Sequence, residues 1–206
     1  MSREPSGGRH YSVGEAYTTV YRMFRSLPAF RRGRRSGMLS GHFTERLMLA
    51  VTEVNQCAMC SYAHTKMALE SGMDIKEIEA MLAGDHTDVN EEELPAILFA
   101  QHYAESRGLP SRAAWQAVTR RYGEAKSFAV LGAIRMMMVG NIYGIPLGSL
   151  LARFSVRAGK KPDPRSSLGY ELAILLSLFV FIPCAALHAA VCAALGTPVL
   201  ATQKEA

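Results

Sequence analysis

The strongest constraint on the fold is the helical spacing of apolar residues, which is plain between Thr44 and Val54. Leu47, Val51 and Val54 recur three or four residues apart, with Met48 beside them, and this repeat places them on one face of a helix. No segment alternates apolar and polar residues over the length of a strand. The chain is therefore predicted to be all-α.

Capping residues and helix breakers divide the chain into a series of predicted helices. Ser12 is a suitable cap for a first helix to about Phe24, and this helix is expected to end at Leu27, because a residue before proline disfavours the helical backbone. The later helices are predicted over residues 44–54, 57–70, 74–82, 88 or 90 to 107, 111–122, 124 to 140 or 143, and 146–157, with a break at Gly123 and a new start at Pro146.

The 206 residues are enough for one domain with a substantial core. We expect a flexible leader, one helical domain, a linker, an apolar C-terminal helix or helical hairpin, and a polar tail. Their predicted bounds are 1–12, 13–158, 159–167, 168–196 and 197–206.

Residues 172–195 form an uncharged apolar run, LAILLSLFVFIPCAALHAAVCAAL, long enough to cross a bilayer. Pro183 and His188 oppose insertion, so burial in the protein or in a subunit interface stays open as an alternative. The basic residues before the run would keep the main domain in the cytosol. A cytoplasmic location is also expected because the N-terminal residues lack the apolar core of a secretory signal.

Positive charge is concentrated near the N-terminus. Residues 1–41 contain eight arginines and two glutamates, whereas the whole chain has a net charge of +5. The cluster at 31–35 is expected to be a solvated turn between two helices. Since no aromatic residues alternate with these arginines, a nucleic-acid partner is not expected.

The segment NQCAMCSYAH places two thiols and an imidazole close together. On a helix, Cys57, Cys60 and His64 share one face, and a thiol in the first turn has its thiolate stabilised by the helix dipole. This arrangement predicts an exposed, acidic thiol suited to thiol-dependent reduction. A zinc site is disfavoured because no second Cys/His pair has suitable spacing, and no metal or bound cofactor is expected.

Glu45, eleven residues, then Cys57-x-x-Cys60-x-x-x-His64 resembles the signature of the alkylhydroperoxidase D-like branch of the carboxymuconolactone decarboxylase family. The resemblance extends through the helices to about Phe154. It implies an all-α fold and a peroxidase in which Cys60 is the peroxidatic cysteine and Cys57 the resolving cysteine. Glu45 and His64 would form the proton relay. Decarboxylation is the weaker reading, since the decarboxylases of this family lack the cysteine pair.

The same resemblance implies a hydroperoxide substrate, a lipoyl-bearing or thioredoxin-like dithiol donor, and a homotrimer or homohexamer. Two other functions stay open. One is a thiol-disulfide oxidoreductase that does not turn over peroxide, and the other is a membrane-associated redox sensor that reaches the membrane through residues 172–195.

Overall fold

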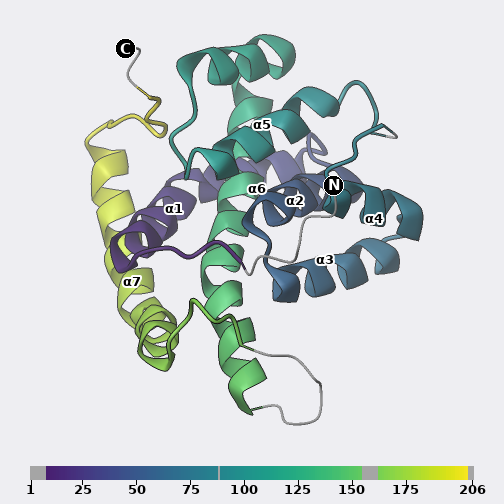
Figure 1. The fold of residues 1–206 in the computed structure, drawn as a ribbon. Coiled ribbons are helices and arrows are strands. Elements are labelled where there is room, and N and C mark those ends of the chain that lie inside the picture. The colour runs from purple at the N-terminus through teal and green to yellow at the C-terminus, as the bar shows by residue number, and fades with distance from the viewer. Residues whose placement is uncertain (1–7, 88, 155–161, 204–206) are drawn as a thin grey trace.

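The computed structural model describes residues 8–87, 89–154 and 162–203. Within these ranges the chain forms seven helices and no strand (Figure 1), which confirms the predicted all-α fold. The helices are α1 (Val13–Arg35), α2 (Gly41–Asn55), α3 (Ala58–Glu70), α4 (Ile75–Ala83), α5 (Leu94–Glu105), α6 (Arg112–Phe154) and α7 (Leu168–Ala194). The first residues of the predicted leader (1–7), the first residues of the predicted linker (159–161) and the end of the polar tail (204–206) lie outside the described residues.

Helix α6 is the centre of the fold, because it packs against α1, α2, α3, α5 and α7. Figure 1 shows it running through the molecule with α7 and α1 on one side and α3 and α4 on the other. Helix α2 is mostly buried, and its apolar residues include those that predicted its helical character from the sequence. The core therefore lies where α1, α2 and α5 meet α6.

Helix α1 does not end at Leu27 as predicted, because it continues through Pro28 to Arg35. A proline inside a helix removes one backbone hydrogen bond and costs roughly 3 kcal/mol. Packing of the second half of α1 on α6 offsets this cost: Gly132 lets the two backbones approach so closely that a Cβ there would stand 2.6 Å from Phe30 Cβ. The arginines at 31–35 are consequently the last turn of a helix rather than a turn between helices.

Helix α6 confirms one predicted break and corrects another. Gly123 has φ 74° and ψ 165°, values that favour glycine, and it separates the two helical parts as predicted. No new helix starts at Pro146, because the helix continues through this buried proline to Phe154. The predicted helix end at Arg157 lies outside the described residues.

Helix α5 begins later than predicted. Asp88 lies outside the described residues, and Asn90 does not cap α5, because its side chain instead accepts a hydrogen bond from the backbone of Glu92 in a turn. Pro95 occupies the first turn of α5, a position that proline favours. The helix consequently starts at Leu94.

Helix α7 is one continuous helix, not a hairpin, and Pro183 lies inside it. Within the described ranges, two helices are long and apolar enough to cross a membrane, α6 and α7. They differ in burial: 72% of the apolar window of α6 is buried in the protein, against 17% of that of α7. Helix α6 is therefore a core helix, while α7 has a large exposed apolar surface that could serve as a membrane anchor.

Candidate active site

The two cysteines of the sequence motif lie at the start of α3 and are joined by a disulfide. Cys57 is the N-cap residue, Cys60 lies in the first turn, and their sulfur atoms are 2.08 Å apart. Cys57 Sγ accepts a hydrogen bond from the backbone N–H of Cys60 at 3.2 Å. Since an N-cap sulfur receives N–H groups that the helix leaves unpaired, this end of α3 stabilises a thiolate on Cys57 after reduction.

Both sulfurs are buried, so the predicted exposed thiol is wrong. Cys57 has no exposed surface and Cys60 is 6% exposed. The cover comes from α6, whose Gly140 carbonyl oxygen lies 3.5 Å from Cys60 Sγ. The motif alone could not show this, because the residues of α6 are about 80 positions further along the chain.

Three glycines one turn apart on α6 provide the space for the start of α3. A Cβ at Gly144 would stand 2.6 Å from Cys60 Sγ and 2.9 Å from the other sulfur, closer than side-chain atoms pack. A Cβ at Gly148 would make an ordinary 3.8 Å contact with Met59 Cβ, and Gly140 contributes the carbonyl described above. Met59, which lies between the two cysteines in the sequence, therefore packs on the same face of α6 as the disulfide.

Glu45 and His64 form a direct pair beside the disulfide. Glu45 Oε2, on α2, lies 2.8 Å from His64 Nδ1, on α3. Both side chains are mostly buried, and the carboxylate fixes the orientation of the ring. His64 lies one turn after Cys60, which leaves Nε2 as the ring nitrogen that can exchange a proton with the site. The structure thus places the four residues selected from the sequence in two contacting pairs, Cys57 with Cys60 and Glu45 with His64, with Cys60 and His64 on successive turns at the start of α3.

A buried polar chain behind the disulfide was missed in the sequence. The Tyr11 hydroxyl donates to Asn55 Oδ1 at 2.5 Å, Asn55 Nδ2 donates to Asn141 Oδ1 at 2.9 Å, and Asn141 Nδ2 donates to Thr52 Oγ1 at 3.3 Å. Burial raises the pKa of Tyr11 to about 12, so its hydroxyl remains a donor at neutral pH.

This chain of hydrogen bonds fixes the end of α2 from which the cysteine segment departs. Asn55 is the last residue of α2, and Gln56 then adopts φ 53°, a left-handed conformation that turns the backbone into Cys57. A left-handed conformation is uncommon outside glycine. Thr52 and Asn55 lie close to the cysteines in the sequence, but no local pattern reveals that Tyr11 and Asn141 meet them.

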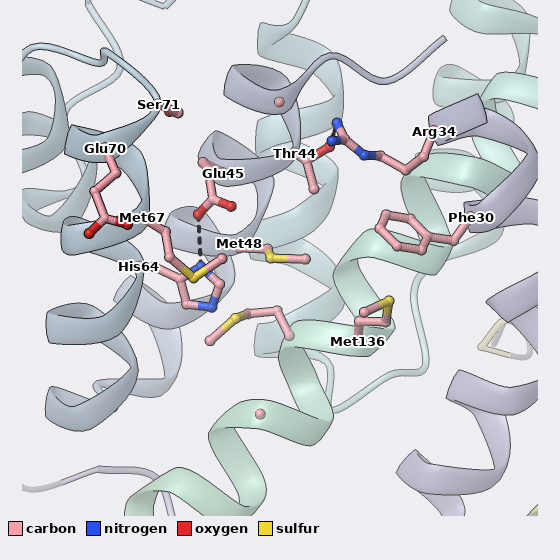
Figure 2. Close-up of a pocket in the computed structure, with 13 residues that line it drawn as sticks. Phe30, Arg34, Thr44, Glu45, Met48, His64, Met67, Glu70, Ser71 and Met136 are labelled. Carbon is pink, nitrogen blue, oxygen red and sulfur yellow. Dashed lines mark hydrogen bonds and ion pairs between the residues drawn. The ribbon is translucent and has the colours of Figure 1, made fainter. Parts of the chain in front are cut away.

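An open pocket of about 720 Å³ borders the Glu45–His64 pair (Figure 2). Figure 2 shows His64 and Glu45 toward one end and Arg34 and Phe30 at the other, with Met48 between them. The complete lining is Phe30, Arg34, Gly41, Thr44, Glu45, Met48, His64, Met67, Glu70, Ser71, Met136, Met137 and Gly140. Neither cysteine is in this lining, but Gly140, which is, has its carbonyl oxygen 3.5 Å from Cys60 Sγ, so the pocket lies next to the disulfide.

Among the described residues, no three His, Cys, Asp or Glu side chains are grouped so as to hold a metal ion. The carboxylate and imidazole at the site contact each other rather than converging on a common point.

Comparison with protein-family models gives a match to part of the chain. The model of the carboxymuconolactone decarboxylase family matches residues 21–101, a segment that includes both cysteines, Glu45 and His64. All of α6 and all of α7 lie outside the matched segment. Comparisons with curated proteins and with solved structures found no match.

Proposed function

Since residues 21–101 match the model of the carboxymuconolactone decarboxylase family, we propose that this protein is a thiol-dependent peroxidase of the alkylhydroperoxidase D-like kind. One observation carries the proposal: a Cys57–Cys60 disulfide lies beside a hydrogen-bonded Glu45–His64 pair. Reduction of a hydroperoxide by a dithiol needs a nucleophilic sulfur, a second thiol and a group that moves protons. The four side chains supply these three requirements.

The proposed cycle begins with both cysteines reduced. His64 accepts the proton of the Cys60 thiol, and Glu45 stabilises the resulting imidazolium. The thiolate attacks the terminal oxygen of the hydroperoxide, so that an S–O bond forms and the O–O bond breaks. The leaving alkoxide takes the proton from His64 and departs as an alcohol, and Cys60 is left as a sulfenic acid, oxidised by two electrons.

Cys57 then resolves this intermediate. Its sulfur attacks the sulfenic sulfur of Cys60, the disulfide forms, and the hydroxyl leaves as water. An external dithiol, lipoyl-bearing or thioredoxin-like, returns two electrons and becomes a disulfide itself. We expect the donor thiolate to attack Cys60, the only one of the two with exposed surface. The leaving Cys57 thiolate is stabilised by the N-terminus of α3.

Two further properties belong to the proposal. Assembly as a homotrimer or homohexamer is implied by the family resemblance. Membrane contact through residues 172–195 is supported by the outer face of α7, where the large apolar side chains Leu176, Phe179 and Leu187 are exposed. Such a face on a soluble monomer is unusual and marks an interaction site.

The decisive experiment is steady-state consumption of tert-butyl hydroperoxide by the reduced protein, with dihydrolipoamide as the donor. We expect many turnovers in the wild type and none in Cys57→Ser or Cys60→Ser. With one equivalent of peroxide, Cys57→Ser should accumulate a sulfenic acid that dimedone labels at Cys60, because no resolving thiol remains.

Other outcomes would replace the proposal. If the disulfide is readily reduced and re-formed by disulfide substrates but no peroxide is consumed, the protein is a thiol-disulfide oxidoreductase. If one equivalent of peroxide oxidises the pair and turnover then stops with every dithiol donor, it is a redox sensor, and the exposed face of α7 becomes the feature that favours a membrane-associated role. Dimedone labelling of Cys57 in Cys60→Ser, with no labelling of Cys60 in Cys57→Ser, would exchange the roles of the two cysteines.

A further inference from the structure

The pocket beside Glu45 and His64 has a composition that selects among hydroperoxides. Its floor and walls are largely apolar, with Phe30 and the four methionines Met48, Met67, Met136 and Met137. Methionine side chains are flexible and polarizable, and they adapt to apolar ligands of irregular shape. The pocket is much larger than hydrogen peroxide requires, since it measures about 720 Å³ and typical small-molecule sites measure ~300–1,000 Å³.

The charges at the pocket are unequally distributed. Glu45 is paired with His64, and Glu70 lies 3.8 Å from Lys66 on the same helix. Both carboxylates come from the side of the pocket that α2 and α3 form, whereas Arg34 reaches the opposite end from α1 (Figure 2). An anionic ligand group is therefore attracted to the Arg34 end and repelled from the other.

Arg34 is held in place without being neutralised. Its Nη1 donates to the Leu39 carbonyl oxygen at 3.0 Å and to Thr44 Oγ1 at 3.2 Å, and both acceptors are uncharged. Among the described residues no carboxylate pairs with Arg34. Other arginines of the fold differ: Arg46, for example, binds both Glu77 and Glu93. The Nε and Nη2 groups of Arg34 thus remain available to a ligand, and guanidinium groups bind carboxylates in a two-point geometry.

We propose that the substrate of this site is an amphipathic hydroperoxide with an apolar body and a carboxylate, of which a hydroperoxy fatty acid is the representative. The inference rests on the proposed peroxidase function and specifies its substrate class. Arg34 binds the carboxylate, the methionine-lined floor accepts the hydrocarbon, and the peroxide group is thereby directed toward His64 and Cys60. Arg34 is a specificity-determining residue and takes no part in the bond-breaking steps.

The test compares the hydroperoxide of linoleic acid with its methyl ester, below the concentration at which either forms micelles. The two differ at one end of the molecule, where the ester has a methyl group in place of the negative charge that Arg34 would bind. We expect kcat/KM of the wild type to be about fivefold higher for the acid, the size of one partly exposed charge contact. This difference should arise from a lower KM for the acid, with kcat unchanged. Arg34→Gln should remove this preference and Arg34→Lys should keep part of it.

The acid-to-ester ratio is taken within each variant, so a general loss of activity cancels. Arg31→Gln is the matched control, because Arg31 is an exposed arginine of the same helix outside the pocket lining, and it should keep the wild-type ratio. Equal kcat/KM values for acid and ester in the wild type would overturn the proposal, as would a preference that survives in Arg34→Gln.

A binding measurement separates this inference from the proposed function. Oleate and methyl oleate carry no peroxide, so their binding to the oxidised protein can be measured by calorimetry without any reaction. We expect oleate to bind more tightly than its ester in the wild type but not in Arg34→Gln. If this difference is found but no peroxide is consumed, the ligand class stands and the peroxidase fails. If peroxides are consumed but oleate and its ester bind equally, the ligand class fails alone.

Discussion

Gly144 lies against the disulfide so closely that a Cβ added to it would stand 2.6 Å from Cys60 Sγ. Gly148, one turn further along the same helix, would place its Cβ at an ordinary 3.8 Å from Met59. The two glycines share a helix and a packing face. They differ in what a methyl group would meet, which makes them a matched pair for testing how tightly α6 encloses the redox centre.

We expect Gly144→Ala to lower the free energy of unfolding of the oxidised protein by ~1–3 kcal/mol, the usual cost of overpacking. Gly148→Ala should raise it by up to ~1 kcal/mol, because alanine favours the helix more than glycine does. Denaturant unfolding of both oxidised variants measures the difference. An oxidised Gly144→Ala protein as stable as Gly148→Ala would mean that the site is looser than the geometry indicates.

The contact between Glu45 and His64 leads to a second prediction. Glu45→Gln keeps a hydrogen-bond acceptor but removes the charge that stabilises the imidazolium, so kcat/KM for hydroperoxide should fall roughly 10²-fold. His64→Gln should lose a similar amount, and the double variant little more than either, because the two residues act as one unit. Stopped-flow oxidation of the reduced protein provides the rates. Fully multiplicative losses would show that the two act independently.

Much of the fold follows from local chemistry in the sequence. Ser12 caps a helix and Gly123 interrupts α6 as predicted, and the helix predicted over residues 74–82 begins with Asp74 as its cap, because each of these effects depends on a few neighbouring residues. The predictions failed at Pro28 and Pro146, where packing against distant elements keeps a helix continuous through a proline. The cost of a proline can be estimated from the sequence, but the contacts that offset it cannot.

In the candidate active site, too, some features follow from the local sequence and others depend on distant packing. Glu45, Cys57, Cys60 and His64 lie within twenty residues. Helical spacing selected the two cysteines and His64, and the resemblance to the family signature added Glu45. Their burial and the glycine face of α6 depend on packing between segments about 80 residues apart. Met136 and Met137 of α6 line the pocket, but nothing in the local sequence distinguishes them from methionines that fill a core.

A third prediction concerns acid stability and Asp163. Hydrogen bonds from Arg165 and the nearby charges of Arg165 and His10 hold the pKa of Asp163 at about 2, below its ordinary value of 3.8. A carboxylate with a lowered pKa contributes stability above the unfolded pKa and loses it as the pH falls through the folded one. The contribution should therefore be complete above about pH 4 and disappear toward pH 2.

Asp163→Asn removes this contribution. We expect the variant to be about 1 kcal/mol less stable than the wild type at pH 6, a value discounted for exposure to solvent, and equal to it near pH 2. Denaturant unfolding at several pH values tests this, with Glu79→Gln on the exposed face of α4 as the control. A deficit that stays constant down to pH 2 would assign the effect to packing rather than to charge.

The fourth prediction concerns how α7 meets a membrane. Its inner face is tied to the protein by polar contacts: Glu171, fully buried, pairs with Arg153, and His188 lies 3.0 Å from the Tyr17 hydroxyl. These contacts would break if α7 crossed the bilayer, whereas its exposed outer face can enter the interface with them intact. We therefore expect the protein to float with anionic phospholipid vesicles and to be released by alkaline carbonate.

Phe179→Ser combined with Leu187→Ser should abolish flotation, because each large apolar side chain contributes ~1.5–3 kcal/mol when buried. Tyr62→Ser, which alters an exposed aromatic residue on α3, is the control and should float as the wild type does. Retention of the wild type after carbonate would favour a spanning helix instead. A different result would make the outer face of α7 a contact between subunits: the wild type does not float, and the double variant has a different particle mass from the wild type in buffer without vesicles. The same apolar side chains would then be buried by protein rather than by lipid.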